Sequence, residues 1–355
     1  MKKVVIIVLS ILSFLILLCC VYYNINIRAV GGKKDVEFKV DTGSTYYTIA
    51  NKLKESNLIR NEFCFKLYVK FNKVNDIQAG TYKLNTNMSV KEIVKLFSKG
   101  NTYNPDAVII TFKEGINMRS IAKTISTYTN NTEDDVFNLL KDSSYLDSLI
   151  NEYWFIDNSI KNTGIYYSLE GYLYPNTYEF KNKNVSVKEI FKVMLDEMDK
   201  KLTQYKTDLV SNKYSIHEIL TLASVVELEG KHASDRAMIA GVFYNRLNKN
   251  MPLGSDVTTY YGSRVDMSER DLYEKELNAN NGYNTRNSNM AGKLPVGPIC
   301  ISSIDSIKAA LYPESNDYIY FLADKNGKVY YTKTYQQHIS KRSELIEAGL
   351  WYTYE

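Results

Sequence analysis

The sequence predicts an α+β protein with a single N-terminal transmembrane helix, a small β-α subdomain and a larger domain of mixed helices and strands. A long apolar segment opens the chain, and helix and strand patterns follow without the regular alternation that a parallel α/β sheet requires. Hydrophobic residues make up 45% of the chain and charged residues 24%, which is typical of folded globular proteins. A length of 355 residues is enough for two or three domains.

Composition and short motifs exclude several functional classes. The net charge of +4, from 44 basic and 40 acidic residues, is too small to predict a nucleic-acid partner. The chain has no phosphate-binding loop, no dinucleotide-binding glycine motif and no serine-nucleophile elbow. His217, His232 and His338 lack the spacing of a zinc-protease helix, so we expect neither a metal nor a cofactor.

The chain opens with a candidate membrane anchor. As a helix, the apolar run from Val4 to Tyr23 would reach about 30 Å, the thickness of a hydrocarbon core. A cleaved signal peptide would need a shorter run and a small-x-small cleavage site, and Cys20 fits a lipidation site poorly. We predict an uncleaved anchor over residues 4–24, with the tail 1–3 in the cytoplasm and the folded domains outside.

The four cysteines do not form a disulfide framework. Cys19 and Cys20 lie in the anchor, whereas Cys64 and Cys300 are far apart in sequence. One disulfide between the latter pair is an alternative, but free buried thiols are the expectation.

A tether over residues 25–35 leads to the small subdomain, residues 36–100. Ser89 and Glu92 have the spacing of a capping box, and Gly100 would end that helix. The expected elements, in order, are a strand at 36–40, a helix with Ile49, Ala50 and Leu53 on one face, a strand at 79–84 and a helix after Ser89.

A weak internal repeat links the two domains. Gly43 precedes Ile49-Ala50 by six residues, as Gly115 precedes Ile121-Ala122, and both glycines follow a strand-like stretch. Strand, glycine turn and helix is a common sequence of elements, and two copies do not make a solenoid. The alternative is a pair of small β-α modules of a carbohydrate-binding type.

The larger domain, residues 101–355, is expected to be mainly helical from about residue 186. One apolar stripe there consists of Val187, Ile190, Phe191, Met194 and Leu195. Near the C-terminus, residues 318–323 and 328–332 flank an Asn-Gly turn and predict a hairpin. A helix carrying His338 follows.

A helix between Ser215 and Gly230 carries the strongest candidate for acid-base chemistry. Ser215 and Glu218 form a capping box at its start. Helical spacing places Glu227 at the end of the apolar face, where the charged form of a carboxyl is disfavoured and its pKa rises. Such a group can protonate a leaving oxygen near neutral pH. The alternative, which the sequence alone favours, is a half-exposed side chain or an ordinary ion pair with a cation such as Arg236.

Further clusters combine tyrosines with polar residues. Tyrosines around a Glu-Gly pair and a proline suit a sugar-binding wall, because rings stack on sugars and hydroxyls form hydrogen bonds with them. The alternatives are an aromatic strand and turn in the core, and ordinary loop chemistry. These clusters are residues 169–180, residues 256–262, and residues 283–286 together with 294–299.

The joint order of these motifs resembles the YceG-like, or MltG, family of endolytic murein transglycosylases. The motifs are Leu-Glu-Gly-x-x-x-Pro-x-Thr-Tyr at 169–178, Leu-Ala-Ser-Val-Val-Glu at 222–227, Val-Phe-Tyr-Asn-Arg-Leu at 242–247, Ser-Asp-x-Thr at 255–258, Tyr-Asn-Thr at 283–285, Leu-Pro-x-Gly-Pro-Ile at 294–299, and Tyr-x-Tyr-Phe-x-Ala-Asp at 318–324 before His338.

The resemblance implies a single-pass anchor, a LysM-like subdomain at about 36–100 and a catalytic domain after it. It implies lytic cleavage of the MurNAc–GlcNAc β-1,4 bond of nascent glycan strands outside the cell membrane, leaving 1,6-anhydro ends beside the peptidoglycan synthases. The expected partners are glycan strands and the membrane. The family's catalytic acid corresponds to Glu227. The residues expected to bind glycan are Glu170, Tyr172, Tyr178, Asp256, Thr258, Asn284 and His338.

The sequence departs from the family pattern near the expected groove. Gly254 stands where Gln is usual, Val257 where Pro is usual, and Ile301-Ser302 where Asn-Pro is usual. These departures bear on the shape of the groove rather than on the acid.

Two alternatives to the lytic enzyme stay open at this point. One is a hydrolase on the same scaffold, with Asp256 or Glu170 as the second carboxylate that hydrolysis normally needs. The other is an anchored glycan-binding or division-scaffold protein without catalysis.

Overall fold

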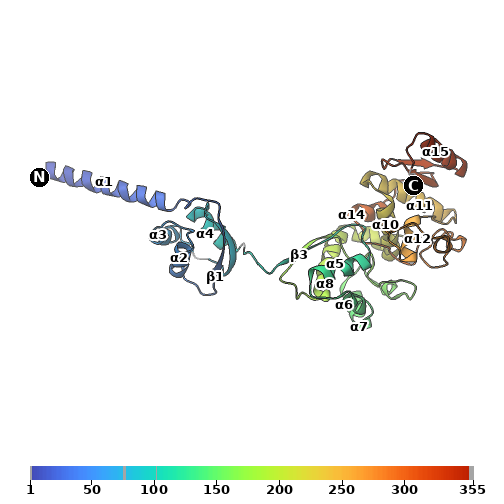
Figure 1. Cartoon of the computed structure of the whole chain (residues 1–355), viewed down its shortest axis with the longest axis horizontal. Helices are drawn as coiled ribbons and strands as arrows, with labels where there is room; N and C mark the ends of the chain where they lie inside the picture. The colour runs from blue at the N-terminus through green and yellow to red at the C-terminus, as the bar shows by residue number, and fades with distance from the viewer. Residues whose placement is uncertain (1, 75–76, 101, 352–355) are drawn as a thin grey trace. The chain divides into compact units, whose positions relative to one another are not determined.

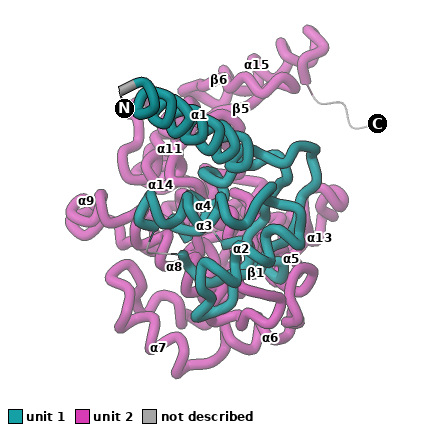
Figure 2. The backbone as a smooth tube through the Cα atoms, turned by 90° about the vertical axis from the view of Figure 1, so that its left-hand side faces the viewer, with its two compact units in different colours: residues 1–107 teal, residues 108–355 magenta. Residues whose placement is uncertain are grey.

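The computed structural model describes residues 2–74, 77–100 and 102–351, so Met1 of the predicted tail and residue 101 of the predicted domain boundary lie outside it. The chain divides into two compact units, residues 1–107 and 108–355 (Figure 2). Both contain helices and antiparallel strand pairs, in agreement with the predicted mixture of α and β structure.

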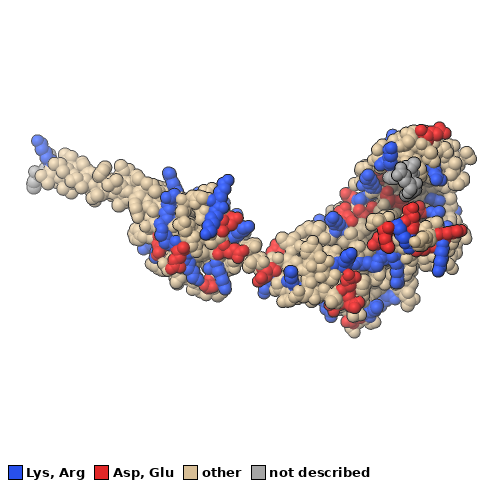
Figure 3. Space-filling model, viewed as in Figure 1, with Lys and Arg blue, Asp and Glu red and all other residues tan. Residues whose placement is uncertain are grey.

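The first unit begins with one long apolar helix, α1 (Lys2–Asn26). Residues Lys3–Asn26 have a mean hydropathy of 3.3, and by length and composition this helix is able to cross a membrane. On the face shown in Figure 3, α1 carries no charged side chains beyond its first residues. The predicted apolar helix is therefore present.

The rest of the first unit is a β-α-α-β-α arrangement around its own core. β1 (Asp35–Val40) pairs antiparallel with β2 (Gly80–Asn85), from Asp35 opposite Asn85 to Val40 opposite Gly80. The helices are α2 (Tyr46–Glu55), α3 (Glu62–Phe71) and α4 (Val90–Lys99). The expected capping box at Ser89 and the glycine stop at Gly100, which has φ +63°, are both confirmed.

Helix α3 was not among the expected elements. Half of its ten residues are aromatic or β-branched, which weakens the helix signal from intrinsic propensity. Two features of the structure stabilise it as a helix. The Asn61 side chain accepts a hydrogen bond from the backbone of Cys64, and Cys64, Phe65 and Val69 are buried in the core.

The internal repeat corresponds to a real structural repeat. Gly43 and Gly115 both have φ +78°, a left-handed conformation that glycine adopts without strain, and each lies between a strand and a helix. In the second unit that strand is β3 (Val108–Phe112), which pairs antiparallel with β4 (Asn176–Phe180), and the helix is α5 (Met118–Tyr128). The Ile-Ala pair of each helix is buried.

The second unit is mainly helical, with one extended hydrophobic core. In this core α10 (Ile216–Glu229) packs against α11 (Ala233–Asn248), α12 (Asp256–Ser263) and α14 (Ile304–Leu311), and Figure 1 shows α10 beside α14. The other helices are α6 (Glu133–Leu139), α7 (Ser143–Glu152), α8 (Val187–Leu202), α9 (Lys206–Ser211), α13 (Glu274–Leu277) and α15 (Tyr335–Glu347). Short 3₁₀ turns lie at Asn158–Lys161, Thr203–Tyr205 and Ser288–Met290.

The predictions for the apolar stripe of α8, for the C-terminal hairpin and for two of the cysteines are confirmed. The whole predicted stripe of α8 is buried. β5 (Tyr320–Ala323) pairs antiparallel with β6 (Val329–Thr332), and Gly327 in the turn has φ +87°. Cys64 and Cys300 are buried free thiols.

Candidate active site

Helix α10 carries the candidate acid, and its sequence fixes where the helix begins and ends. The Ser215 side chain accepts from the Glu218 backbone while the Glu218 carboxylate accepts from the Ser215 backbone, so the predicted capping box is formed. The helix ends at Glu229, and the Gly230 backbone closes its last turn. The side chains from Ile219 to Val226 are buried, which fixes the orientation of the last turn and of the two carboxyls that it carries.

Glu227 is enclosed by hydrogen-bond donors. Its side chain is only 5% exposed. Oε1 accepts from Arg236 Nη2 at 2.9 Å, and Oε2 accepts from the Ser303 backbone at 2.8 Å and from the Ser303 hydroxyl at 2.6 Å. The sequence predicted either an apolar surrounding or an Arg236 ion pair, and the structure shows the ion pair.

Arg236 and Ser303 close a ring of contacts around this carboxyl. Arg236 Nη1 donates to Ser303 Oγ at 2.6 Å, and Arg236 Nε donates to the Gly230 carbonyl at 3.2 Å. Ser303 is also the N-cap of α14, so Glu227 lies at the N-terminal end of that helix, where a negative charge is stabilised. The sequence analysis missed Ser303, because only the fold brings it beside a residue 76 positions earlier.

A second carboxylate, Glu114, lies on the segment that pairs with the chain just before Ser303. Gly115 N–H donates to the Ile301 carbonyl at 2.8 Å, and Ile301 N–H donates to the Ile116 carbonyl at 3.0 Å. Partial burial, together with the negative charge of Glu227, raises the pKa of Glu114. Sequence analysis had singled out the neighbouring glycine but not this glutamate.

Glu229, the last residue of α10, faces a different set of groups. Its Oε1 accepts from the Ser255 hydroxyl at 2.6 Å. Burial raises the pKa of Glu229 to about 7, against the opposing effect of Ser255, and the nearby charge of Asp256 contributes to the rise. The predicted ligand Asp256 is itself exposed and ion-paired with Arg286.

Glu170, a predicted glycan ligand, lies in the interior and is 2% exposed. Its Oε2 accepts from the Met118 backbone at 3.0 Å and from the Tyr261 hydroxyl at 2.8 Å. Because Met118 is the first residue of α5, the carboxyl stabilises the start of that helix. Burial raises the pKa of Glu170 to about 7.

The aromatic cluster at 169–180 lies in the hydrophobic core, which was the alternative to a sugar-binding wall. Tyr172 is 1% exposed, and its hydroxyl lies 2.8 Å from His217 Nδ1. Tyr178 lies in β4, and its hydroxyl donates to the Tyr174 carbonyl at 2.7 Å. A Cβ added at Gly171 would lie 2.3 Å from Pro298, so the Glu-Gly and Gly-Pro motifs meet by close backbone packing.

Thr258 and Asn284 are also fully buried. Thr258 Oγ1 donates to the Ser255 carbonyl at 2.7 Å. The Asn284 amide nitrogen donates to the carbonyls of Leu277 and Ala279 at 2.9 and 2.8 Å. These two side chains thus hold the loops around α12 together, and their hydrogen bonds are made within the protein.

His338 lies on α15 and is partly buried, 5.3 Å from the ring of Tyr320. Burial and the positive charges of Arg246 and Arg342 lower the pKa of His338. Arg246 also lies near Gly254, where a Cβ would be 3.5 Å from the guanidinium. Gly254 has φ +64°, which explains why glycine is favoured at this departure from the family pattern.

A cavity of about 270 Å³ adjoins the end of α10. Leu228, which lies between Glu227 and Glu229 in sequence, is one of the residues that line it. Besides Leu228 it is lined by residues of the 115–120 segment, of α12 and of the 265–268 loop. Glu227 itself is not among the residues that line this cavity, but Leu228, the next residue of α10, is.

Comparisons with known proteins show which family the chain resembles. Residues 38–344 match the YceG-like family. The chain is 36% identical over 317 residues to the endolytic murein transglycosylase of Bacillus subtilis (strain 168), covering 89% of this chain and 86% of that protein. It is 31% identical over 334 residues to the endolytic murein transglycosylase of Streptococcus pneumoniae serotype 2 (strain D39 / NCTC 7466), covering 90% of this chain and 60% of that protein.

A solved structure resembles the chain as well. The crystal structure of a yceG-like protein, lmo1499, from Listeria monocytogenes is 36% identical in sequence, with a TM-score of 0.62. The similarity covers 87% of this chain and 100% of that one.

Proposed function

Because the chain belongs to the YceG-like family, we propose that it is a lytic transglycosylase that cleaves the glycan strands of peptidoglycan. The names of its relatives favour an enzyme over a glycan-binding scaffold. The observation that carries the proposal is Glu227, a buried carboxyl in the last turn of α10 that accepts three hydrogen bonds and precedes Leu228, which lines a cavity.

In the first step, Glu227 donates its proton to the glycosidic oxygen as the C1–O bond breaks. The carboxylate that results is the form that the observed contacts suit, since Arg236 and both donor groups of Ser303 point at its oxygens. In the second step, Glu227 takes the proton of the C6 hydroxyl of the muramyl sugar. That oxygen attacks C1 and closes a 1,6-anhydro ring, so no water is consumed.

The predicted glycan ligands divide into two groups under this proposal. Glu170, Tyr172, Tyr178, Thr258 and Asn284 are buried and bonded to other protein groups, and we assign them to supporting the loops of the groove. Asp256 is exposed and His338 is partly exposed, so these two keep the role of direct contact with glycan.

Glu114 favours a second candidate, hydrolysis on the same scaffold. A hydrolase needs a second carboxylate beside the acid to act on water or as nucleophile. Glu114 is the preferred partner, because Glu170 is buried and Asp256 is ion-paired, whereas the charge of Glu227 contributes to the raised pKa of Glu114.

Product analysis separates the two candidates. The full-length chain in detergent is incubated with purified glycan strands, and the new ends are identified by mass spectrometry. The lytic proposal expects 1,6-anhydromuramyl ends. Reducing muramyl ends, carrying one added water and abolished by Glu114→Gln, would establish hydrolysis instead.

We also propose that α1 spans the cell membrane and that the second unit works on its outer side. The support is the length and mean hydropathy of Lys3–Asn26. Added protease should digest the second unit in cells stripped of their wall while α1 stays with the membrane. Full protection of the second unit would reverse the proposed orientation. The LysM-like character of the first unit and an association with synthases remain predictions.

A further inference from the structure

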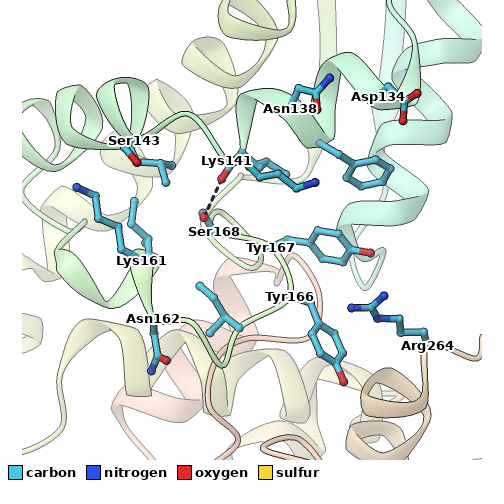
Figure 4. Close-up of a pocket in the computed structure, with 15 residues that line it drawn as sticks. Asp134, Asn138, Lys141, Ser143, Lys161, Asn162, Tyr166, Tyr167, Ser168 and Arg264 are labelled. Carbon is cyan, nitrogen blue, oxygen red and sulfur yellow. Dashed lines mark hydrogen bonds between the residues drawn. The ribbon is translucent and has the colours of Figure 1, made fainter.

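A second cavity of the second unit has no part in the proposed mechanism. It is a cavity of about 580 Å³ between the end of α6, the start of α7, the 160–168 segment and the residue after α12 (Figure 4). The side chains that matter for its chemistry are Phe137, Lys141, Lys161, Tyr166, Tyr167 and Arg264.

The lining is cationic. It contains three basic side chains, Lys141, Lys161 and Arg264, against one carboxylate, Asp134. Lys161 is already ion-paired with Asp147, and in Figure 4 it points to the opposite side of the cavity from Lys141. Within the part of the chain that the structure describes, Lys141 and Arg264 form no ion pair with a protein carboxylate, so both charges are available to a ligand.

Arg264 adopts an unfavourable backbone conformation. It closes α12 with φ +57°, the left-handed region in which Gly or Asn is less strained. Its guanidinium lies 4.4 Å from the ring centre of Tyr166, and the Tyr166 hydroxyl donates to the Gly262 carbonyl at 2.7 Å. A non-glycine residue in this backbone region beside a cavity is a reason to look for a function there.

The cavity also has an aromatic side. Phe137 and Tyr167 stack with their ring centres 5.4 Å apart, and both line the hollow. Such a pair offers an apolar surface to the carbon chain of a ligand, whereas the cations select its charge.

Helix α12 connects this cavity with the proposed active site. Ser255, which binds Glu229, lies at the start of α12, and Arg264 lies at its end. Eight helical residues span about 12 Å. This length separates Arg264 from the contact of Ser255 with Glu229, which lies two residues after Glu227 on α10. We take it as short enough for the side branches of a strand bound at the end of α10 to reach the cavity.

We propose that this cavity binds the carboxylate-bearing peptide stem of the murein strand, with Lys141 and Arg264 as its charge partners. Murein differs from an unsubstituted glycan by its short acidic peptides, and Arg and Lys pair with carboxylates by charge-assisted hydrogen bonds. The inference rests on the proposed function for its substrate, but direct binding tests it without catalysis.

Calorimetry with the full-length chain in detergent is the first test. The probe is the synthetic tripeptide L-alanyl-γ-D-glutamyl-L-lysine, compared with the same peptide with both carboxyls amidated. We expect saturable binding of the acid form alone. Lys141→Gln and Arg264→Asn should each weaken it roughly three- to tenfold, as for the loss of one charged contact. Lys123→Gln, at an exposed lysine of α5, is the matched control and should leave binding unchanged.

Arg264→Asn also separates recognition from folding. Since Asn tolerates the left-handed conformation better than Arg, the variant should melt at the same or a higher temperature while binding the peptide less well. If Arg264→Asn lost its fold together with its binding, the peptide affinity of Lys141→Gln would decide the test.

Cleavage gives the second test. The ratio of kcat/KM on peptide-bearing strands to that on strands stripped of peptide by an amidase should exceed one, and it should fall toward one in both variants. Equal binding of acid and amidated peptide, no binding of either, or an unchanged ratio in both variants would overturn the proposal. If the tripeptide binds as expected but no strand is cleaved, the proposed function fails and the peptide site stands.

Discussion

Glu227 and Glu170 are two buried carboxyls of the same unit that are held in opposite ways. Glu227 accepts three hydrogen bonds, one of them from a guanidinium. Glu170 accepts two from neutral groups, and among the described residues its Oε1 has no hydrogen-bond partner. Burial raises the pKa of Glu170 to about 7.

If Glu227 is the acid, as proposed, then burial and a raised pKa do not by themselves identify a catalytic acid. By those two signs Glu170 would be chosen, yet it lies in the interior and stabilises the start of α5. Glu227 differs by position, because it lies in the last turn of α10, next in sequence to Leu228, which lines a cavity. The predictions that follow test the two environments in order of expected effect.

The largest effect on stability is expected at Arg236. Arg236→Gln removes the positive partner of a carboxylate whose side chain is 5% exposed, and breaking a buried pair costs about 3–5 kcal/mol. Chemical denaturation measures this loss. Combining Arg236→Gln with Glu227→Gln should restore part of the stability, because no buried charge is then left unpaired. A single variant as stable as the wild type would contradict the described ion pair.

Glu170 should make stability depend on pH. Its pKa rises from the ordinary glutamate value of 4.5 to about 7 in the fold, so the folded state binds the extra proton. Stability from this group is therefore full below about pH 4.5 and is lost as the pH rises to 7, by roughly 3 kcal/mol at 1.36 kcal/mol per pKa unit.

Glu170→Gln removes that dependence. The free energy of unfolding of the variant relative to wild type should rise between pH 4.5 and pH 8 by the same amount, about 3 kcal/mol. Glu229 shows the same direction of shift, so Glu229→Gln serves as a parallel case rather than as a control. A flat difference for Glu170→Gln would contradict its buried environment.

A smaller effect is expected at Ser303. Ser303→Ala removes the hydroxyl that donates to Glu227 and accepts from Arg236, but it keeps the backbone donor. Loss of a hydrogen bond to a charged group costs about 1.5–3 kcal/mol. Because Ser303 positions the acid rather than touching the substrate, kcat should fall more than KM rises. Ser302→Ala, at the neighbouring buried serine, is the matched control. An unchanged kcat would remove Ser303 from a positioning role.

Much of this site could be predicted from the sequence where the signal was local. The start and end of α10 follow from Ser215, Glu218 and Gly230, and helical spacing placed Glu227 on the buried side. Arg236 is only nine residues away, so its pairing was foreseeable. Ser303 and Glu114 reach the site through the pairing of Gly115 and Ile116 with Ile301, which no local pattern encodes.

The predicted glycan ligands show where prediction from residue type alone was insufficient. Tyr172, Thr258 and Asn284 have the residue types of a sugar site, but their polar groups bond to His217 or to backbone carbonyls. A polar side chain in a motif can serve a loop as well as a ligand, and only burial distinguishes the two. Helix α3 is a further case, because its aromatic residues gave a weak helix signal although the Asn61 cap and burial in the core stabilise a helix there.

The central claim is that Glu227, and not Glu170, is the carboxyl that reacts. The direct measurement compares initial rates of glycan-strand cleavage by wild type, Glu227→Gln and Glu170→Gln, with the folded fraction of each measured by circular dichroism. The account predicts that Glu227→Gln is folded and about 10²–10⁴-fold slower, while Glu170→Gln keeps activity in proportion to its folded fraction. A folded Glu227→Gln protein with full activity, or a folded Glu170→Gln protein with none, would contradict it.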